Sequence, residues 1–280
     1  MDLRRLKTIF IFVLALMNIV FCAIIYNAQT YEKKEHQIMT ESLNNLLAKY
    51  MIYLSPKLEL PKSPTIYRFY LEKSFGNNDD LIKRFLGDGA YTAHGNDYSN
   101  ETGRLHLSGD EFKFYNLKPA DTITDFSEKN IERLCREEME RLGIFSELYV
   151  FSGINFPDDG VTAIFTVQHE DFAFFDAYIS FDVESRGITS ISGRNMLSGL
   201  ETSRSESKFF NIMSILTDLS NNPALEKNVV HSIVIITPGY YIGKTAESYR
   251  NILAIPVWQI ATDTGKILYY DARSGKCITE

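Results

Sequence analysis

Hydrophobic residues fall along the chain in three patterns, and each predicts a different kind of element. Between residues 8 and 26 there are nineteen positions without charge, nearly all of them aliphatic or aromatic. Farther on, apolar residues recur every three to four positions in some segments, as on one face of a helix, and every second position in others, as in a strand. The chain therefore predicts one long apolar helix followed by an α+β body.

The apolar run is long enough to cross a bilayer, since 19 residues at 1.5 Å each cover roughly 28 Å. The tip 1–7 holds three basic residues and one acidic residue, whereas the segment that follows the run is balanced in charge. Basic flanks stay on the cytoplasmic side. We therefore expect a cell-membrane protein with a cytoplasmic tip at 1–7, a single transmembrane helix at 8–26 in contact with lipid, and an extracytoplasmic C-terminal domain.

A cleaved signal peptide is the competing interpretation, because it also begins with basic residues and an apolar stretch. This run exceeds a usual signal-peptide core, and no small-x-small cleavage site precedes the polar segment. Cys22 lies deep in the run without a typical lipobox before it, which argues against a lipoprotein. The pattern favours a retained anchor.

Helical spacing of leucines predicts a juxtamembrane helix within 27–55, which Pro56 ends. It continues the span as a stalk or folds back onto the body. A first α+β subdomain follows at 56–120. Its expected elements are a strand at 65–71, a helix at 79–86, a polar loop at 87–103 and a strand pair at 104–115.

Two further units are predicted, each a helix lying on an antiparallel sheet. The first, 126–195, opens with Ser127 as a helix N-cap and Gly143 as the helix end, and strands follow at 148–151, 161–168, 172–181 and 188–191. The second, 205–280, has a helix at 205–219 and strands at 229–236, 252–261 and 266–271, with a short run at 276–279.

The two units also share short sequences, which predicts a tandem repeat. AIFTV from Ala163 and FDVESRGIT from Phe181 match AIPVW from Ala254 and YDARSGKCIT from Tyr270. A chance match is the alternative, since strand-turn-strand segments share composition. The predicted fold is therefore α+β, with the last two units as a predicted tandem repeat.

The second of these units also carries a family resemblance. IPVWQI from Ile255, then Tyr269-Tyr270-Asp271-Ala272 and Gly275, resembles the C-terminal end of the YycI family. The chain start is similar too, with a short basic tip and KTIFI from Lys7 entering a single span. The hairpin that ends in an aromatic-Asp-x-x-x-Gly turn also looks like PepSY-type binding or inhibitory modules.

The resemblance implies a function. YycI proteins are membrane-anchored regulators that associate with the sensor histidine kinase of a Gram-positive cell-wall two-component system, alongside a YycH-like accessory protein. It therefore implies a non-catalytic regulator with those two partners, which contacts the kinase through the span and the exported domain. The alternative is an anchored PepSY-like binding or protease-inhibitory module.

The net charge argues against nucleic acid as a partner, and the few cysteines argue against a disulfide-based fold. The net charge is −7, and it becomes −9 without the tip, whose charge is +2. An acidic exported domain disfavours nucleic acid as a partner. Only Cys135 and Cys277 lie beyond the span. Cys135 falls on the apolar face of a predicted helix, which favours a buried free thiol over a disulfide.

The sequence contains no recognisable catalytic or metal-binding motif. None of its five histidines pair at the spacing of a helical metal site, and no Walker loop, dinucleotide fingerprint or Gly-x-Ser-x-Gly is present. The run His169-Glu170-Asp171 reads as a hairpin tip. We expect no catalytic residues, no metal and no cofactor. An extracytoplasmic hydrolase is the weakest of the three hypotheses.

The candidate contact residues lie in the span. Asn18 is a carboxamide at mid-span, where a hydrogen bond to another helix would offset part of its cost in lipid, although it can instead bond its own backbone. Leu14 and Cys22 lie one turn away on each side. We predict that these three residues contact a partner helix. Trp258, the single tryptophan, is expected to be a packing residue.

Overall fold

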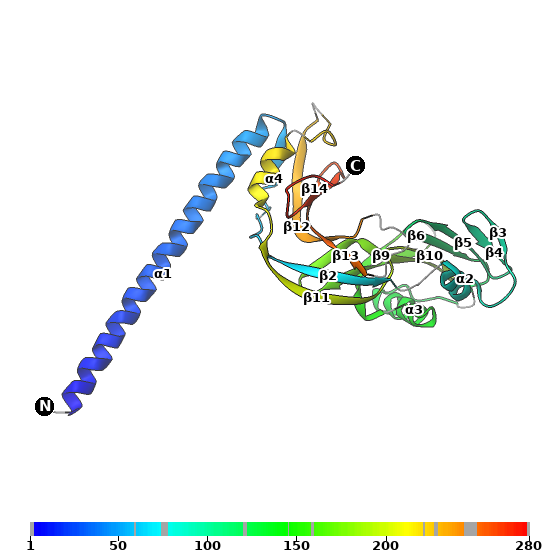
Figure 1. Cartoon of the computed structure of the whole chain (residues 1–280), viewed down its shortest axis with the longest axis horizontal. Helices are drawn as coiled ribbons and strands as arrows, with labels where there is room; N and C mark the ends of the chain where they lie inside the picture. Colours follow the sequence, from blue (N-terminus) through cyan, green and yellow to red (C-terminus); the bar gives the residue numbers. More distant parts are fainter. Residues whose placement is uncertain are drawn as a thin grey trace.

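The chain forms an α+β body rich in β-sheet, with one long helix leading into it (Figure 1). A computed structural model describes residues 3–58, 60–73, 78–119, 122–144, 146–157, 160–220, 222–226, 229–243 and 251–278. The turn residues Asp158 and Asp159 and the end of the short run predicted at 276–279 lie outside these ranges.

The first helix, α1 (Leu3–Ala48), has 46 residues, which corresponds to about 69 Å. It continues from 8–26 into 27–55 without a break, so the stalk arrangement is the one observed. Only its last turns pack on the body, where Leu43 and Leu47 are buried. The helix ends before Pro56 because Met51 has a φ of 60° and the short strand β1 (Ile52–Leu54) follows.

The described side chains from Phe12 to Asn27 are all exposed. In the part of the chain that the structure describes, no helix is long and apolar enough to cross a membrane. The start of the predicted span falls outside the described side chains, which omit 3–9 and 11.

The main sheet combines strands from most of the chain, with β9 at its centre. Its longest path runs β15-β14-β12-β9-β10-β6-β5-β4-β3, with β8 beside β9, β7 beside β8 and β1 beside β12. Its further strands are β3 (Thr92–His94), β4 (Asp97–Ser99), β5 (Gly103–Ser108), β6 (Glu111–Asn116), β7 (Tyr149–Asn155), β8 (Val161–His169), β9 (Phe172–Glu184), β10 (Gly187–Arg194), β12 (His231–Tyr241), β14 (Ile255–Thr262) and β15 (Ile267–Asp271).

β9 joins two halves of this sheet. Its first residues pair in parallel with β12, with Ala173 opposite Gly239, and its last residues pair with β10. The pairings are antiparallel except for those of β12 with β9 and with β1. The predicted units 56–120, 126–195 and 205–280 therefore share one sheet.

A second sheet of three strands, in the order β11-β2-β13, lies against the first. Its strands are β2 (Thr65–Lys73), β11 (Leu197–Lys208) and β13 (Asn251–Leu253). Beyond the end of β13, the Tyr240 hydroxyl takes the place of a strand neighbour for β2. It accepts from the Tyr67 N–H and donates to the Tyr67 carbonyl, both at 2.8 Å.

Two helices cover one face of the main sheet. Phe85 of α2 (Asn78–Leu86) packs against Phe112 and Phe114 of β6. The helix α3 (Glu128–Arg141) buries Ile131, Cys135 and Met139 and lies over β7 and β8. The strand residues beneath both helices belong to one face by register, which leaves the opposite face to polar side chains.

The sequence predicted most strands and the helices α2 and α3, and the structure differs from it in four places. The predicted loop 87–103 contains β3 and β4. The helix predicted at 205–219 is α4 (Ile212–Leu219), because β11 extends to Lys208. The 3₁₀ helix η1 (Ser146–Leu148) precedes β7. Ser127 precedes α3 as predicted, but its hydroxyl donates to Asp125 and does not cap the helix.

The tandem repeat remains a prediction. α3 is followed by the meander β7-β8-β9 and α4 by the meander β12-β14-β15, and both are antiparallel. The matched sequences differ in register, however. Ala163 lies opposite Phe181, whereas Tyr270 lies opposite Trp258, four residues beyond Ala254.

Candidate functional site

The three predicted contact residues lie along one stripe of α1. Leu14, Asn18 and Cys22 are spaced four residues apart, which places them on neighbouring turns of the same side. All three are exposed, and Leu14 is 46% exposed. Figure 1 shows this part of α1 extending away from the body. The stripe is free to meet another helix, but its partner contact stays a prediction.

The second candidate surface is the polar face of the main sheet, opposite α2 and α3. Strand register sets its side chains in rows that cross the sheet. One row reads Thr162, Asp182, Ser190, Tyr115, Arg104 and Ser99, from β8 to β4. The next reads Ile164, Ser180, Ser192, Lys113, His106 and Asp97. Hydroxyl and charged groups from distant sequence positions therefore adjoin one another.

Within these rows, local pairs fix several side chains. The Ser180 and Ser192 hydroxyls lie 2.8 Å apart. His106 Nδ1 lies 2.8 Å from Asp97 Oδ1. The Lys113 ammonium sits 4.9 Å from the centre of the Tyr115 ring, within cation–π range. This surface holds both signs of charge.

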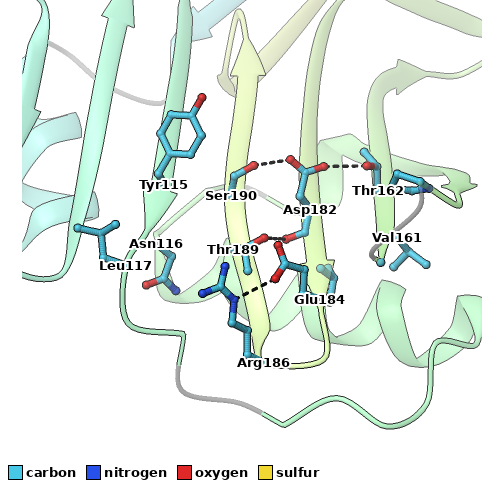
Figure 2. A pocket seen from close by; sticks show the side chains of 13 residues that line it. Tyr115, Asn116, Leu117, Val161, Thr162, Asp182, Glu184, Arg186, Thr189 and Ser190 are labelled. Carbon is cyan, nitrogen blue, oxygen red and sulfur yellow. Dashed lines mark hydrogen bonds and ion pairs between the residues drawn. The ribbon is translucent and has the colours of Figure 1, made fainter.

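The first row ends in a cleft of about 670 Å³ (Figure 2). The cleft lies where β6, β8, β9 and β10 end on this face. Its lining residues are Tyr115, Asn116, Leu117, Pro157, Gly160, Val161, Thr162, Asp182, Val183, Glu184, Arg186, Thr189 and Ser190. A volume of this size is within the range of small-ligand sites.

Asp182 is the central polar group of the cleft. The Thr162 hydroxyl donates to its Oδ1 at 2.7 Å and the Ser190 hydroxyl donates to its Oδ2 at 2.5 Å, one from each neighbouring strand (Figure 2). The Thr189 hydroxyl donates to the Asp182 carbonyl at 3.3 Å. Two donors on opposite oxygens hold the carboxylate in one orientation. Asp182 is half-buried.

The rim of the cleft is built by the β9–β10 turn and the β8 start. Arg186 Nε donates to Glu184 Oε2 at 2.9 Å, so this ion pair closes one side (Figure 2). Gly160 has a φ of 155°, and a Cβ there would lie 2.4 Å from the Val183 carbonyl oxygen. The close approach of these two backbones therefore requires glycine at the cleft wall.

A buried carboxylate, Asp176, stabilises the junction of the two sheet halves. It accepts the N–H groups of Ile242 and Gly243, both at 2.8 Å, and the Asn195 amide at 3.1 Å. Burial raises the pKa of Asp176 above its ordinary range, and these N–H groups together with the Arg194 charge oppose that rise. Its contacts lie within the fold, which makes it a structural group.

The remaining candidates from the sequence have structural positions. Cys135 is buried and Cys277 is exposed, and neither forms a disulfide, which confirms the predicted buried thiol of Cys135. Trp258 is fully buried and donates its indole N–H to the Phe210 carbonyl at 2.9 Å, so it is a packing residue as predicted. Across the described ranges, no three His, Cys, Asp or Glu side chains gather as a metal site.

Sequence reasoning did not find the cleft. Thr162, Asp182 and Ser190 are 20 and 8 residues apart, and only the pairing of three strands brings them together. The available signal was the alternation in β9, where Ser180, Asp182 and Glu184 recur at every second position between buried residues. That alternation identifies a polar face without identifying the groups opposite it.

Comparison with known proteins leaves the family open. No protein-family model matches the chain, and no curated protein sequence matches it. An uncharacterized protein from Eubacterium rectale ATCC 33656 is similar in structure, with a TM-score of 0.44 and 12% identity over 79% of this chain and 86% of that one. The C-terminal domain of YpeB from Bacillus megaterium is similar with a TM-score of 0.36 and 8% identity, over 72% and 93%. At these TM-scores neither likeness supports a functional argument, and the YycI resemblance stays a prediction.

Proposed function

We propose that this chain is a single-pass, membrane-anchored regulator of a sensor histidine kinase in a cell-wall two-component system. It acts without catalysis, through protein contacts of its transmembrane helix and its extracytoplasmic body, and a YycH-like accessory protein is its second partner. The kinase, the accessory protein and the YycI assignment come from the sequence resemblance. The anchor comes from the basic tip and the uncharged run 8–26.

The observation that carries the proposal is the exposure of apolar side chains around α1. Phe12, Val13 and Phe21 are 72%, 50% and 54% exposed, and they lie on different sides of the helix. An apolar surface this extensive requires lipid or protein to cover it. Because Leu43 and Leu47 fix the other end of the same helix in the body, a shift of the span would be transmitted to the sheet.

Regulation would follow from differential binding. If the span and the body bind one signalling state of the kinase more tightly than the other, they shift the kinase toward that state. Asn18 is the polar group with which the span would select a partner, since interhelical hydrogen bonds in membranes contribute about 0.6 kcal/mol on average. The open polar sheet face also suits the alternative, an anchored PepSY-like binding or inhibitory module.

The test is chemical crosslinking in native membranes followed by mass spectrometry. The proposal expects a sensor kinase among the adducts and a lower yield when Asn18→Leu is made. Val20→Leu is the matched control, because residue 20 lies about 200° around the helix from residue 18. Recovery of cell-wall proteases alone would overturn the proposal in favour of the inhibitory module. Equal kinase yields from both variants would remove Asn18 from the contact.

A further inference from the structure

Around Asp182, the side chains of Thr162 and Ser190 offer a ligand hydrogen-bond acceptors and no free donor. The Thr162 and Ser190 hydroxyls each use their single proton on Asp182, which leaves only their oxygen lone pairs for a ligand. Each Asp182 oxygen accepts one of these bonds and retains capacity for another. A ligand that fits this surface must therefore bring donors.

Among the described residues, the Asp182 carboxylate also has no basic side chain as a counter-ion. Arg186 is engaged by Glu184 at 2.9 Å. Within the described parts of the chain, no Lys, Arg or His nitrogen lies within ion-pair distance of Asp182. A half-buried carboxylate that has hydroxyl partners but no counter-ion gains most from a cation, because charge-assisted hydrogen bonds are about twice as strong as neutral ones.

We propose that this cleft binds an alkylammonium group, with Asp182 as the ligand's charge partner and the Thr162 and Ser190 oxygens as additional acceptors. The ammonium has three donors, which match three acceptors converging from β8, β9 and β10. The volume of about 670 Å³ accommodates a chain of several carbons behind the charged head. Leu117 lines the cleft, is 49% exposed and suits that chain.

Two sources supply this chemistry, a free diamine and the side chain of a lysine in a peptide. This inference does not depend on the proposed regulator function, since the cleft lies in the body and α1 contributes no lining residue. Its failure would leave the kinase contact untouched, and loss of the kinase contact would leave the ammonium site standing.

The experiment is isothermal titration of the full-length chain in detergent with 1,5-diaminopentane, 1,5-pentanediol and an acetyl-lysine-amide peptide. Binding of the diamine without the diol is the expected result, and comparison of the diamine with the peptide identifies the source. Asp182→Asn keeps the shape of the side chain and should weaken binding by about ten- to a hundredfold, the effect expected for loss of a hydrogen bond to a charged group.

Asp97→Asn is the matched control, since it removes a carboxylate from the same sheet face four strands away, roughly 19 Å. Its affinity should equal that of the wild type. Leu117→Lys serves if Asp182→Asn does not fold. Leu117 is 49% exposed, so the new ammonium should be tolerated and should compete with the ligand. Equal binding of the diol and the diamine, or unchanged affinity in Asp182→Asn or Leu117→Lys, would overturn the proposal.

Discussion

Replacing Tyr240 by phenylalanine tests how the two sheets are held together. Tyr240 is fully buried, and its hydroxyl is the partner of both backbone groups of Tyr67 at 2.8 Å. Burial raises the pKa of Tyr240 to about 12, so the hydroxyl stays protonated at neutral pH and keeps donating. The substitution retains the ring and its edge-on contact with Phe69, at 4.5 Å between centroids, and removes only the hydroxyl.

The expected loss follows from the two backbone groups left behind. An unsatisfied buried donor or acceptor costs about 1–3 kcal/mol. Because Tyr67 is only half-buried and water can reach part of this site, we expect a total near the lower end, about 2–4 kcal/mol. The N–H and carbonyl of Tyr67 lose their partners at the same time, so the effect should exceed that of a single hydrogen bond.

Urea denaturation of the full-length chain in detergent measures this loss, and hydrogen exchange locates it. Tyr53→Phe is the matched control, since Tyr53 is 45% exposed and the chemical change is the same. The Tyr67 amide should exchange faster in Tyr240→Phe than in Tyr53→Phe. If both variants stay within about 0.5 kcal/mol of the wild type, the hydroxyl does not join the sheets.

Three further predictions concern burial and charge. Because the pKa of Asp176 is raised, it contributes stability that is present below the unfolded pKa of about 3.9 and lost as pH rises through the folded pKa. In urea denaturation, the free energy of unfolding of the wild type should therefore rise relative to that of Asp176→Asn between pH 7 and pH 4, and a relative fall would contradict the burial argument. Leu47→Ala should lower the free energy of unfolding by about 2–5 kcal/mol in the same assay because the side chain is fully buried, whereas Met39→Ala, at a half-exposed site, should change it little. Equal losses would show that α1 is not fixed through Leu47. In the native protein, maleimide should label Cys277 and should not label Cys135, whose thiol pKa is raised by burial. Labelling of native Cys135, detected by mass spectrometry, would refute its burial.

Much of the fold could be predicted because its strands carry their own pattern. In β8 and β9, buried and half-exposed positions alternate along the strand, and the sequence places both strands within three residues of their ends. β11 was missed because LSGLETSRSESK is polar and reads as a loop before a helix. It forms a strand because β2 supplies its partner, with Thr202 opposite Phe69, and local propensity gives way to that pairing.

The candidate site was less predictable for a different reason. The stripe of Leu14, Asn18 and Cys22 follows from helical spacing alone, so the sequence suffices to place those residues together. The cleft depends on strand register across β8, β9 and β10, including an irregularity between Ile188 and Ser190. A shift of one residue would turn Ser190 to the opposite face, and no local pattern determines that register.

A photo-crosslinking residue at position 14 tests the central claim, that α1 is a contact surface for a sensor kinase, most directly. In living cells, we expect an adduct with the transmembrane region of the kinase, and a weaker adduct when Asn18→Leu is added. The same crosslinker at position 16, on the other side of the helix, should give much less. Adducts with lipid or cell-wall proteases alone, or equal kinase adducts from both positions, would contradict the account.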